Sequence, residues 1–156
     1  MPLSKLTEFL DKHNKKYVVI KHSQAYTAQE VAASAHIPGK NMAKTVMARI
    51  NGKLSMLVLP STHRVDFGHL KEVLGTDDVK IATEKEFEDL FPGSELGAMP
   101  PFGNLFNMKT YVAESLIDDD EIAFNAGTHK EVVQMSYDDF EELVKPEIIP
   151  LAIKHA

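Results

Sequence analysis

The stretch Lys44-Thr-Val-Met-Ala-Arg-Ile-Asn-Gly-Lys-Leu-Ser-Met-Leu-Val-Leu59 decides the fold expected for this chain. Two largely apolar runs, 44–50 and 54–59, flank the dipeptide Asn51-Gly52. An Asn-Gly pair between two such runs is the strongest short-range signal for a β-hairpin, because both residues tolerate the positive φ angles of a two-residue turn. We therefore predict two antiparallel strands joined at Asn51-Gly52.

On the N-terminal side of this hairpin, the pattern predicts a helix, a strand and a second helix. Apolar residues recur at helical spacing over 6–13, and the run 17–20 is typical of a buried strand. Thr27 and Glu30 have the spacing of a capping box, which predicts that another helix begins there. Pro38-Gly39 then ends that helix, because proline and glycine both disfavour its continuation.

The C-terminal side of the hairpin carries helices and short strands in irregular order. The segment 92–103 is rich in Pro and Gly but has apolar residues on both sides, so we expect a loop that is held against the core. The other predicted elements are helices at 67–74, 83–91 and 136–144 and strands at 110–113, 121–124 and 132–135. Because strands and helices do not alternate regularly, we predict an α/β mixed (α+β) fold, with helices packed around a mixed sheet.

The composition is that of one compact domain. The chain has 156 residues, of which 44% are hydrophobic, so we expect a single domain over 1–156 with a substantial core. It has no cysteine, which excludes a disulfide framework, a thiolate metal site and a cysteine nucleophile. No apolar stretch is long enough for a signal peptide or a membrane span, so we expect a cytoplasmic protein without a membrane partner.

Charge is distributed unevenly along the chain. The net charge is −6, yet residues 1–80 carry 12 basic and 7 acidic side chains, whereas residues 81–156 carry 5 and 16. The acidic total argues against a protein that coats nucleic acid indiscriminately, and we expect no DNA partner. Two differently solvated faces are the simpler explanation of the asymmetry, and a face that contacts phosphates is the alternative. The candidates for such a face are Lys12, Lys15, Lys16, Lys21 and Lys40.

Lys44 is the first of three candidate sites for chemistry. It has the same strand parity as Val46, Ala48 and Ile50, so its stem should point to the apolar side of the hairpin. Partial desolvation favours the neutral form of an amine, and a poised amine near a carbonyl is a common catalytic device. Taken alone, however, a lysine at the start of a strand is more often a surface residue whose ammonium reaches water.

The second candidate is the loop Gly97-Ala-Met-Pro-Pro-Phe-Gly103. Two consecutive prolines restrict the backbone beside residues whose amide hydrogens have no helix or strand partner, and such amides can stabilise an oxyanion. Gly97, Ala98 and Met99 can donate in this way, whereas the two prolines lack the hydrogen. A rigid surface turn explains the same sequence equally well.

The third candidate is Ala126-Gly-Thr-His129, which directly follows the predicted strand 121–124. A histidine at the end of a strand can act as an acid, as a base or as an anchor for the substrate. For His129 taken alone, a structural histidine with satisfied hydrogen bonds is the more common case. The motif is therefore a candidate that needs other residues around it.

Several standard sites are absent from the sequence. Residues 39–45 imitate a phosphate-binding loop, but Ala43 replaces the last glycine, and a strand is predicted where that motif requires a helix. There is no Gly-x-Ser-x-Gly elbow, and the seven histidines have no spacing that is typical of a zinc site. The acidic run 118–120 is best explained as a solvated turn. We therefore expect no metal and no cofactor.

Five segments taken together resemble a known family. They are Thr27-Ala-Gln-Glu-Val-Ala, Ile37-Pro-Gly, Ala43-Lys-Thr-Val, Gly97-Ala-Met-Pro-Pro-Phe-Gly and Ala126-Gly-Thr-His. In this order they resemble the YbaK family, which is related to the editing domain inserted in bacterial prolyl-tRNA synthetases. The resemblance extends from about Thr27 to Val144, so the chain is similar to a stand-alone member. It implies a central sheet that is partly barrel-like.

The resemblance also implies an activity, the hydrolysis of the ester that joins an amino acid to the terminal adenosine of tRNA. Lys44 matches the essential lysine of the family, Gly97–Pro101 match its Gly-x-x-x-Pro loop for the substrate carbonyl, and His129 matches the histidine of its pocket. The residues thus expected to be catalytic are Lys44, Gly97, Ala98, Met99 and His129. Those expected to bind substrate are Thr45, Pro100, Pro101, Phe102, Gly103, Gly127 and Thr128.

The predicted function is that of a trans-editing hydrolase, which removes the wrong amino acid from tRNA. Its expected partner is the acceptor end of a mischarged tRNA, and the need for an aminoacyl-tRNA synthetase is left open. Water is the default nucleophile, and a group of the substrate is the alternative. One departure from the family is Ala113, where many similar sequences carry an acid, so we assign no acidic function to this position, although Glu114 lies next to it.

Two other functions are compatible with the same residues. A non-catalytic module would use the pocket to hold an aminoacyl-adenosine, a nucleotide or a partner protein, but it would not require both a lysine in an apolar setting and a loop restricted by prolines. A hydrolase of small esters or amides unrelated to tRNA is disfavoured by the basic N-terminal half. A turnover assay and the salt dependence of the rate distinguish the three functions.

Overall fold

The hairpin at Asn51-Gly52 runs through the centre of the molecule. The computed structural model describes residues 2–22, 28–35, 37–91, 98–150 and 152–154. Strand β2 (Ala43–Ile50) pairs antiparallel with β3 (Lys53–Pro60). Asn51 and Gly52 have φ angles of 51° and 81°, the left-handed conformation that the turn requires. The predicted hairpin is therefore confirmed.

The two hairpin strands belong to a mixed sheet. Among the described residues its strand order is β5-β2-β3-β6-β9, with β5 at Val79–Ile81, β6 at Lys109–Ala113 and β9 at Glu147–Ile149. The pair β2–β5 is antiparallel, whereas β3–β6 and β6–β9 are parallel. The parallel and antiparallel pairs confirm the mixed sheet that the irregular order of elements predicted.

A second sheet meets the first at the start of β2. It is antiparallel and has the order β1-β8-β7, with β1 at Tyr17–Lys21, β8 at Glu131–Ser136 and β7 at Glu121–Asn125. A parallel bridge between Met42 and Ala123 joins the N-terminal end of β2 to β7. Strands β4 (His63–Val65) and β10 (Ala152–Lys154) form a separate antiparallel pair. The strands thus continue from one sheet into the next, as in a partly open barrel.

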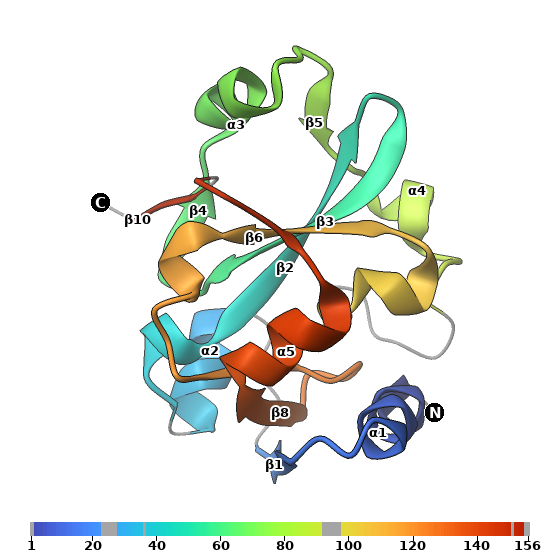
Figure 1. Ribbon diagram of the computed structural model, residues 1–156, viewed down its shortest axis with the longest axis vertical. Helices are drawn as coiled ribbons and strands as arrows, with labels where there is room; N and C mark the ends of the chain where they lie inside the picture. Colours follow the sequence, from blue (N-terminus) through green and yellow to red (C-terminus); the bar gives the residue numbers. More distant parts are fainter. Residues whose placement is uncertain (1, 23–27, 36, 92–97, 151, 155–156) are drawn as a thin grey trace.

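Helices lie around these sheets. They are α1 (Pro2–Lys12), α2 (Ala28–Ser34), α3 (Phe67–Leu74), α4 (Glu84–Phe87) and α5 (Tyr137–Val144), with 3-10 turns η1 (Gly39–Asn41), η2 (Gly103–Phe106) and η3 (Glu114–Leu116). In Figure 1, α3 and β5 lie near one end of the hairpin and α1 and β1 lie at the opposite end of the molecule. No helix in the described part of the chain has the length and hydrophobicity needed to cross a bilayer.

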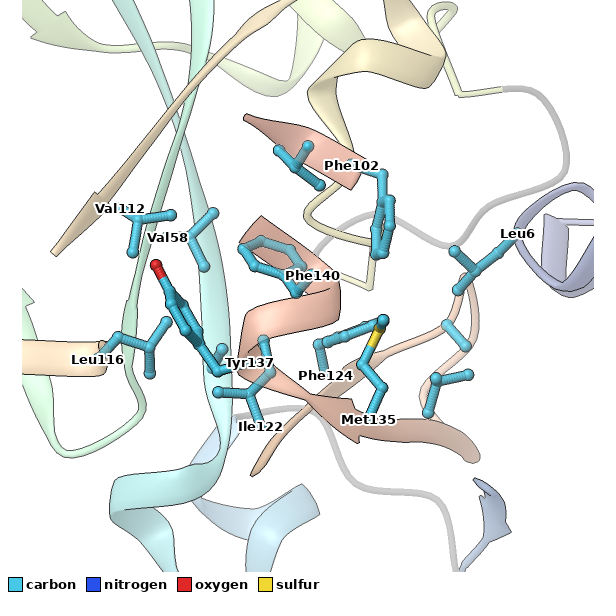
Figure 2. Packing of buried hydrophobic residues seen from close by; sticks show 14 of the residues in the cluster. Leu6, Val58, Phe102, Val112, Leu116, Ile122, Phe124, Met135, Tyr137 and Phe140 are labelled. Atoms are coloured by element: carbon cyan, nitrogen blue, oxygen red, sulfur yellow. The ribbon is translucent and has the colours of Figure 1, made fainter. Parts of the chain in front are cut away.

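An aromatic cluster fills the space between the two sheets and α5. Phe102, Phe124 and Phe140 are buried, and the ring of Phe102 lies 5.5 Å from that of Phe124 and 5.4 Å from that of Phe140 in edge-to-face geometry. Figure 2 shows Phe140 between Phe102 on one side and Val58 on the other. Such edge-to-face pairs add stability beyond the burial of area. This cluster holds the loop that contains Phe102 against both sheets.

Two local expectations are corrected by the structure. The strand 17–20 was expected to be buried, but Val18 is 57% exposed because β1 is the edge of its sheet and pairs with β8 alone among the described strands. The helix expected over 83–91 ends at Phe87, although Thr83 and Glu86 do form the predicted capping box. Phe87 and Phe91 still pack against each other with their rings 6.3 Å apart, so the apolar pattern reflects burial and not a longer helix.

Candidate functional site

The loop 98–103 is tied to two neighbouring segments by its first two carbonyl groups. The Gly127 amide donates a hydrogen bond of 2.8 Å to the Ala98 carbonyl, and the Thr45 hydroxyl donates one of 3.4 Å to the Met99 carbonyl. Gly127 has a φ of 99°, which glycine adopts far more readily than other residues. The structure thus brings together four of the predicted site residues, two from the loop and one from each segment that holds it.

The remainder of the loop is anchored in the core. Phe102 donates its amide to the Pro100 carbonyl at 2.8 Å, and its side chain is fully buried. The Gly103 amide donates to Thr110 Oγ1 at 3.2 Å, and a Cβ atom at position 103 would collide with that oxygen. Pro101 is buried as well. The expectation that the loop is held against the core is therefore confirmed for its described residues, whereas Gly97 lies outside them.

Lys44 lies between two apolar clusters on one face of β2. Met42, two residues before Lys44, packs in a cluster with Val31 of α2, and Ala48, four residues after it, packs in a cluster with Leu70 of α3. Burial lowers the pKa of Lys44 below its usual value of 10.5, because the charged form loses hydration. Within the described residues Lys44 has no acidic partner. The predicted partial desolvation of this amine is confirmed.

Strands β2 and β7 separate directly after the bridge between Met42 and Ala123. Residues 43–46 pair with β3 but with no second strand in the described part of the chain, until Ala48 pairs with Ile81 of β5. The loop that begins at Ala98 is hydrogen-bonded to both sides of this opening. We call the opening the fork, and its residues are Lys44, Thr45, Ala98, Met99, Asn125 and Gly127.

Asn125 is a residue of the fork that the sequence analysis missed. It is the last residue of β7, its side chain is 8% exposed, and its Oδ1 atom has no hydrogen-bond partner. Asn125 and Lys44 each lie two residues after a partner of the bridge between Ala123 and Met42, so both directly follow the point where the two strands separate. The signal that could have found it is its position directly before the Ala126–His129 motif.

The turn after β7 buries His129, which is 6% exposed. The turn is closed by a 3.1 Å hydrogen bond from the Ala126 amide to the Glu131 carbonyl. The Thr128 hydroxyl donates to the Glu131 carboxylate at 3.2 Å and accepts from the Lys130 amide at 3.3 Å. These contacts fix the backbone on both sides of His129, and its catalytic role stays a prediction.

Residues 22–143 match the family model of the aminoacyl-tRNA editing domain. The chain belongs to this family. The match covers most of the 156 residues and includes the fork, the described part of the loop and the turn around His129. The resemblance to the YbaK family that the sequence motifs indicated is therefore confirmed.

Similar proteins place this editing domain in context. A proline–tRNA ligase of Staphylococcus saprophyticus is 31% identical over 96 residues, which are 60% of this chain and 16% of the ligase. The chain therefore spans about a sixth of the length of that curated relative. A candidate trans-editing enzyme for prolyl-tRNA synthetase superposes with a TM-score of 0.81 at 20% identity, over 99% of this chain and 98% of that one. A hypothetical protein superposes with a TM-score of 0.84 at 20% identity, over 96% and 99%. At such identities the two structures show the shared fold.

The basic surface of the editing domain is smaller than the lysine pattern predicted. Lys15 forms ion pairs of 2.6 Å with Glu142 and 3.5 Å with Asp139, and the bond to Glu142 raises its pKa. Its charge is therefore neutralised by α5. The positive charge of Lys40 lowers the pKa of the partly buried Asp119. Loss of hydration has the larger effect and raises that pKa overall. The candidates for phosphate contact that remain exposed are Lys12, Lys16, Lys21 and Lys40.

A hollow of about 620 Å³ lies beside the tip of the hairpin. Its lining includes Asn51 at the tip of the hairpin, Lys53, Lys109 and Phe106. None of the predicted site residues lines it. The hollow is therefore not the place where the candidate catalytic residues lie. We place the site at the fork, because the restricted backbone and the partly desolvated amine lie there.

The fork of the editing domain can present hydrogen-bond donors to a polarised carbonyl group. The Ala98 amide has no acceptor within the described residues, and its position is fixed because the carbonyls of Ala98 and Met99 are both hydrogen-bonded. Lys44 directly precedes Thr45, which is bonded to this loop, and its amine has hydration reduced by burial. Fixed donors in a partly dehydrated site stabilise negative charge more strongly than the same donors in water.

Proposed function

We propose that this editing domain acts in trans as a hydrolase that deacylates mischarged aminoacyl-tRNA. The observation that supports this function most directly is the placement of Lys44, which has no acidic partner among the described residues, at the fork that holds the backbone of Ala98 and Met99. Membership of the editing family supports an aminoacyl-tRNA substrate. The likeness to part of a proline–tRNA ligase supports a synthetase as a partner in translation.

In the proposed reaction, water attacks the carbonyl carbon of the ester and the carbonyl oxygen takes up negative charge. The backbone amides of Ala98 and Met99 donate to this oxyanion, while Lys44 orients the terminal ribose or the ester and stabilises the charge. The bond between the carbonyl carbon and the ribose oxygen then breaks, and that oxygen takes a proton. The products are the free amino acid and a tRNA with its terminal hydroxyl restored. We assign His129 to anchoring the substrate.

The remaining predicted residues support this geometry in the proposal. Thr45 and Gly127 hold the loop carbonyls, and the Thr128 hydroxyl stabilises the turn that carries His129. The residues from Pro100 to Gly103 hold the other end of the loop in the core. Their contribution to substrate binding would then be indirect, through the position of the amides.

The first test is the substitution Lys44→Ala. We expect a loss of at least about a hundredfold in the rate of deacylation of mischarged tRNA, comparable with removal of an oxyanion donor, and no loss of folding. Lys53→Ala is the matched control, because Lys53 is an exposed lysine at the tip of the same hairpin. Deacylation by Lys44→Ala at the parent rate would show that the assigned role of Lys44 is wrong.

The same assay, with a panel of tRNAs that carry radiolabelled amino acids, tests the whole function. Multiple turnovers with release of free amino acid are expected. Stoichiometric retention without release would instead indicate a binding module. Salt separates the third possibility, because deacylation that depends on phosphate contacts weakens as salt rises, whereas the hydrolysis of a small neutral ester changes little.

A further inference from the structure

The side-chain oxygen of Asn125 is buried without a hydrogen bond. Its side chain is 8% exposed, and its Oδ1 atom is shielded from solvent and has no partner. Buried polar groups in folded proteins are nearly always hydrogen-bonded, because an acceptor that loses water without gaining a partner destabilises the fold. An exception of this kind at the edge of a candidate site indicates that a ligand supplies the missing donor.

The position of Asn125 ties this acceptor to the fork. Ala43 and Phe124, which follow the bridging residues Met42 and Ala123, both belong to one buried core cluster, so the two chain segments enter the same core directly after the bridge. The next position on β7 is Asn125, and the next on β2 is Lys44. Each of them lies two residues after a bridging residue, at the base of the fork, and Asn125 is two residues before Gly127, whose amide holds the loop.

The chemistry of an aminoacyl ester limits what Oδ1 can accept. The ester itself offers acceptors, which suit the backbone amides and Lys44. The α-amine carries the strongest donors of the aminoacyl group, and a hydrogen bond from a charged amine is stronger than one from a neutral donor. An amide oxygen is also compatible with the amine of Lys44 at the fork, because a carboxylate close to that amine would pair with the ammonium and raise its pKa.

We propose that Oδ1 of Asn125 accepts a hydrogen bond from the α-amine of the aminoacyl group, which makes Asn125 a residue that positions the substrate. This proposal rests on the proposed deacylase function and extends it to a group of the substrate that does not react. It explains why an unpaired acceptor is kept in an otherwise well-packed strand. It also predicts that the protein distinguishes aminoacyl esters from esters of the same carbon skeleton without the amine.

The test compares two substrates on one tRNA, the aminoacyl ester that the wild-type protein hydrolyses and its deamino analogue, in which hydrogen replaces the α-amine. For the wild type we expect kcat/KM to be about 10- to 100-fold higher with the amine, the range for a hydrogen bond to a charged group. Asn125→Ala should lose most of this preference by slowing the aminoacyl ester and leaving the analogue nearly unchanged. Asn104→Ala, on the exposed η2 turn, is the control and should change neither rate.

Two further measurements separate positioning from a structural role. Asn125→Ala should keep or raise the melting temperature, because it removes an unpaired buried acceptor, whereas a structural asparagine would lower it. Asn125→Asp is nearly isosteric and should shift the pH dependence of kcat to higher pH, because the carboxylate would raise the pKa of Lys44.

The outcomes that overturn the proposal are distinct from those that overturn the function. A wild-type protein that releases amino acid from no substrate contradicts the deacylase function and this proposal with it. An active wild type contradicts this proposal alone if Asn125→Ala slows both esters equally, or leaves the aminoacyl ester unaffected. A lower melting temperature of Asn125→Ala with an equal loss on both esters would assign Asn125 to the structure of β7.

Discussion

The aromatic cluster and the fork both include residues of β7 and of the loop 98–103, but they differ in how their groups are satisfied. In the cluster, Phe102, Phe124 and Phe140 contact one another edge to face and are fully or almost fully buried. In the fork, the amine of Lys44 is partly dehydrated without an acidic partner in the described chain, and Oδ1 of Asn125 has no donor. One region is optimised for packing, whereas the other keeps polar groups that a stable core would exclude.

This difference indicates which region of the editing domain carries its function. Unpaired polar groups reduce the free energy of unfolding, so they persist where a ligand completes them. The two regions are joined by the loop 98–103, whose first carbonyls are held at the fork and whose Phe102 ring is held in the cluster. The cluster therefore stabilises the position of the amides that the proposed reaction uses.

The largest expected effect on stability comes from a substitution that disrupts the aromatic cluster. Phe102→Ala should lower the free energy of unfolding by about 3–5 kcal/mol, the usual cost of removing a buried phenylalanine ring. It should also lower deacylation at temperatures where the variant is folded, because the loop loses its anchor. Urea unfolding and a single-turnover assay measure the two effects. Phe106→Ala, at a partly buried position of η2, is the control and should cost clearly less stability.

A smaller effect is expected where the fork holds the loop. Thr45→Val keeps the shape of the side chain but removes the hydroxyl that donates to the Met99 carbonyl at 3.4 Å. We expect a loss of about 0.5–1.5 kcal/mol in the free energy of unfolding, the net value of an ordinary hydrogen bond. The rate of deacylation should fall by up to about tenfold. Thr45→Ser should restore both, and equal rates for all three proteins would show that this tie does not position the loop.

The smallest expected effect is the change in stability when the buried charge of Lys44 is removed. The size of this change depends on pH. Because burial lowers its pKa below 10.5, the folded protein binds fewer protons than the unfolded chain in the window between the lowered pKa and 10.5. The destabilisation is complete below that window and disappears as the pH rises through it. Lys44→Met should therefore be more stable than the wild type at pH 7, and this difference should shrink as the pH approaches 10.5.

Urea unfolding at neutral and at high pH measures this change. Lys53→Met, at the exposed tip of the hairpin, is the control for the general effect of removing a lysine, and it should show the same difference at both pH values. A stability advantage of Lys44→Met that grows with pH would contradict the partial dehydration of Lys44.

Several features of the fold could be predicted because their causes are local. The hairpin depends on the left-handed conformation of Asn51 and Gly52, and the capping box at Thr83 depends on residues three positions apart. The short strands β4, β5, β9 and β10 could not be predicted, because three residues have no clear periodicity and each becomes a strand only by pairing with a distant partner. The exposure of Val18 was missed for the same reason.

The sequence by itself determined the hairpin, the family motifs and the apolar setting of Lys44, because strand parity and turn chemistry act between residues that are close in the chain. Only the tertiary structure decided that Thr45 and Gly127 hold the loop and that the Asn125 amide oxygen is buried at the fork. Hydrogen bonds between residues tens of positions apart, and the lack of a partner for a buried oxygen, depend on how all the segments pack. The physical reason is that the satisfaction of a polar group is a property of its surroundings in space and not of its neighbours in sequence.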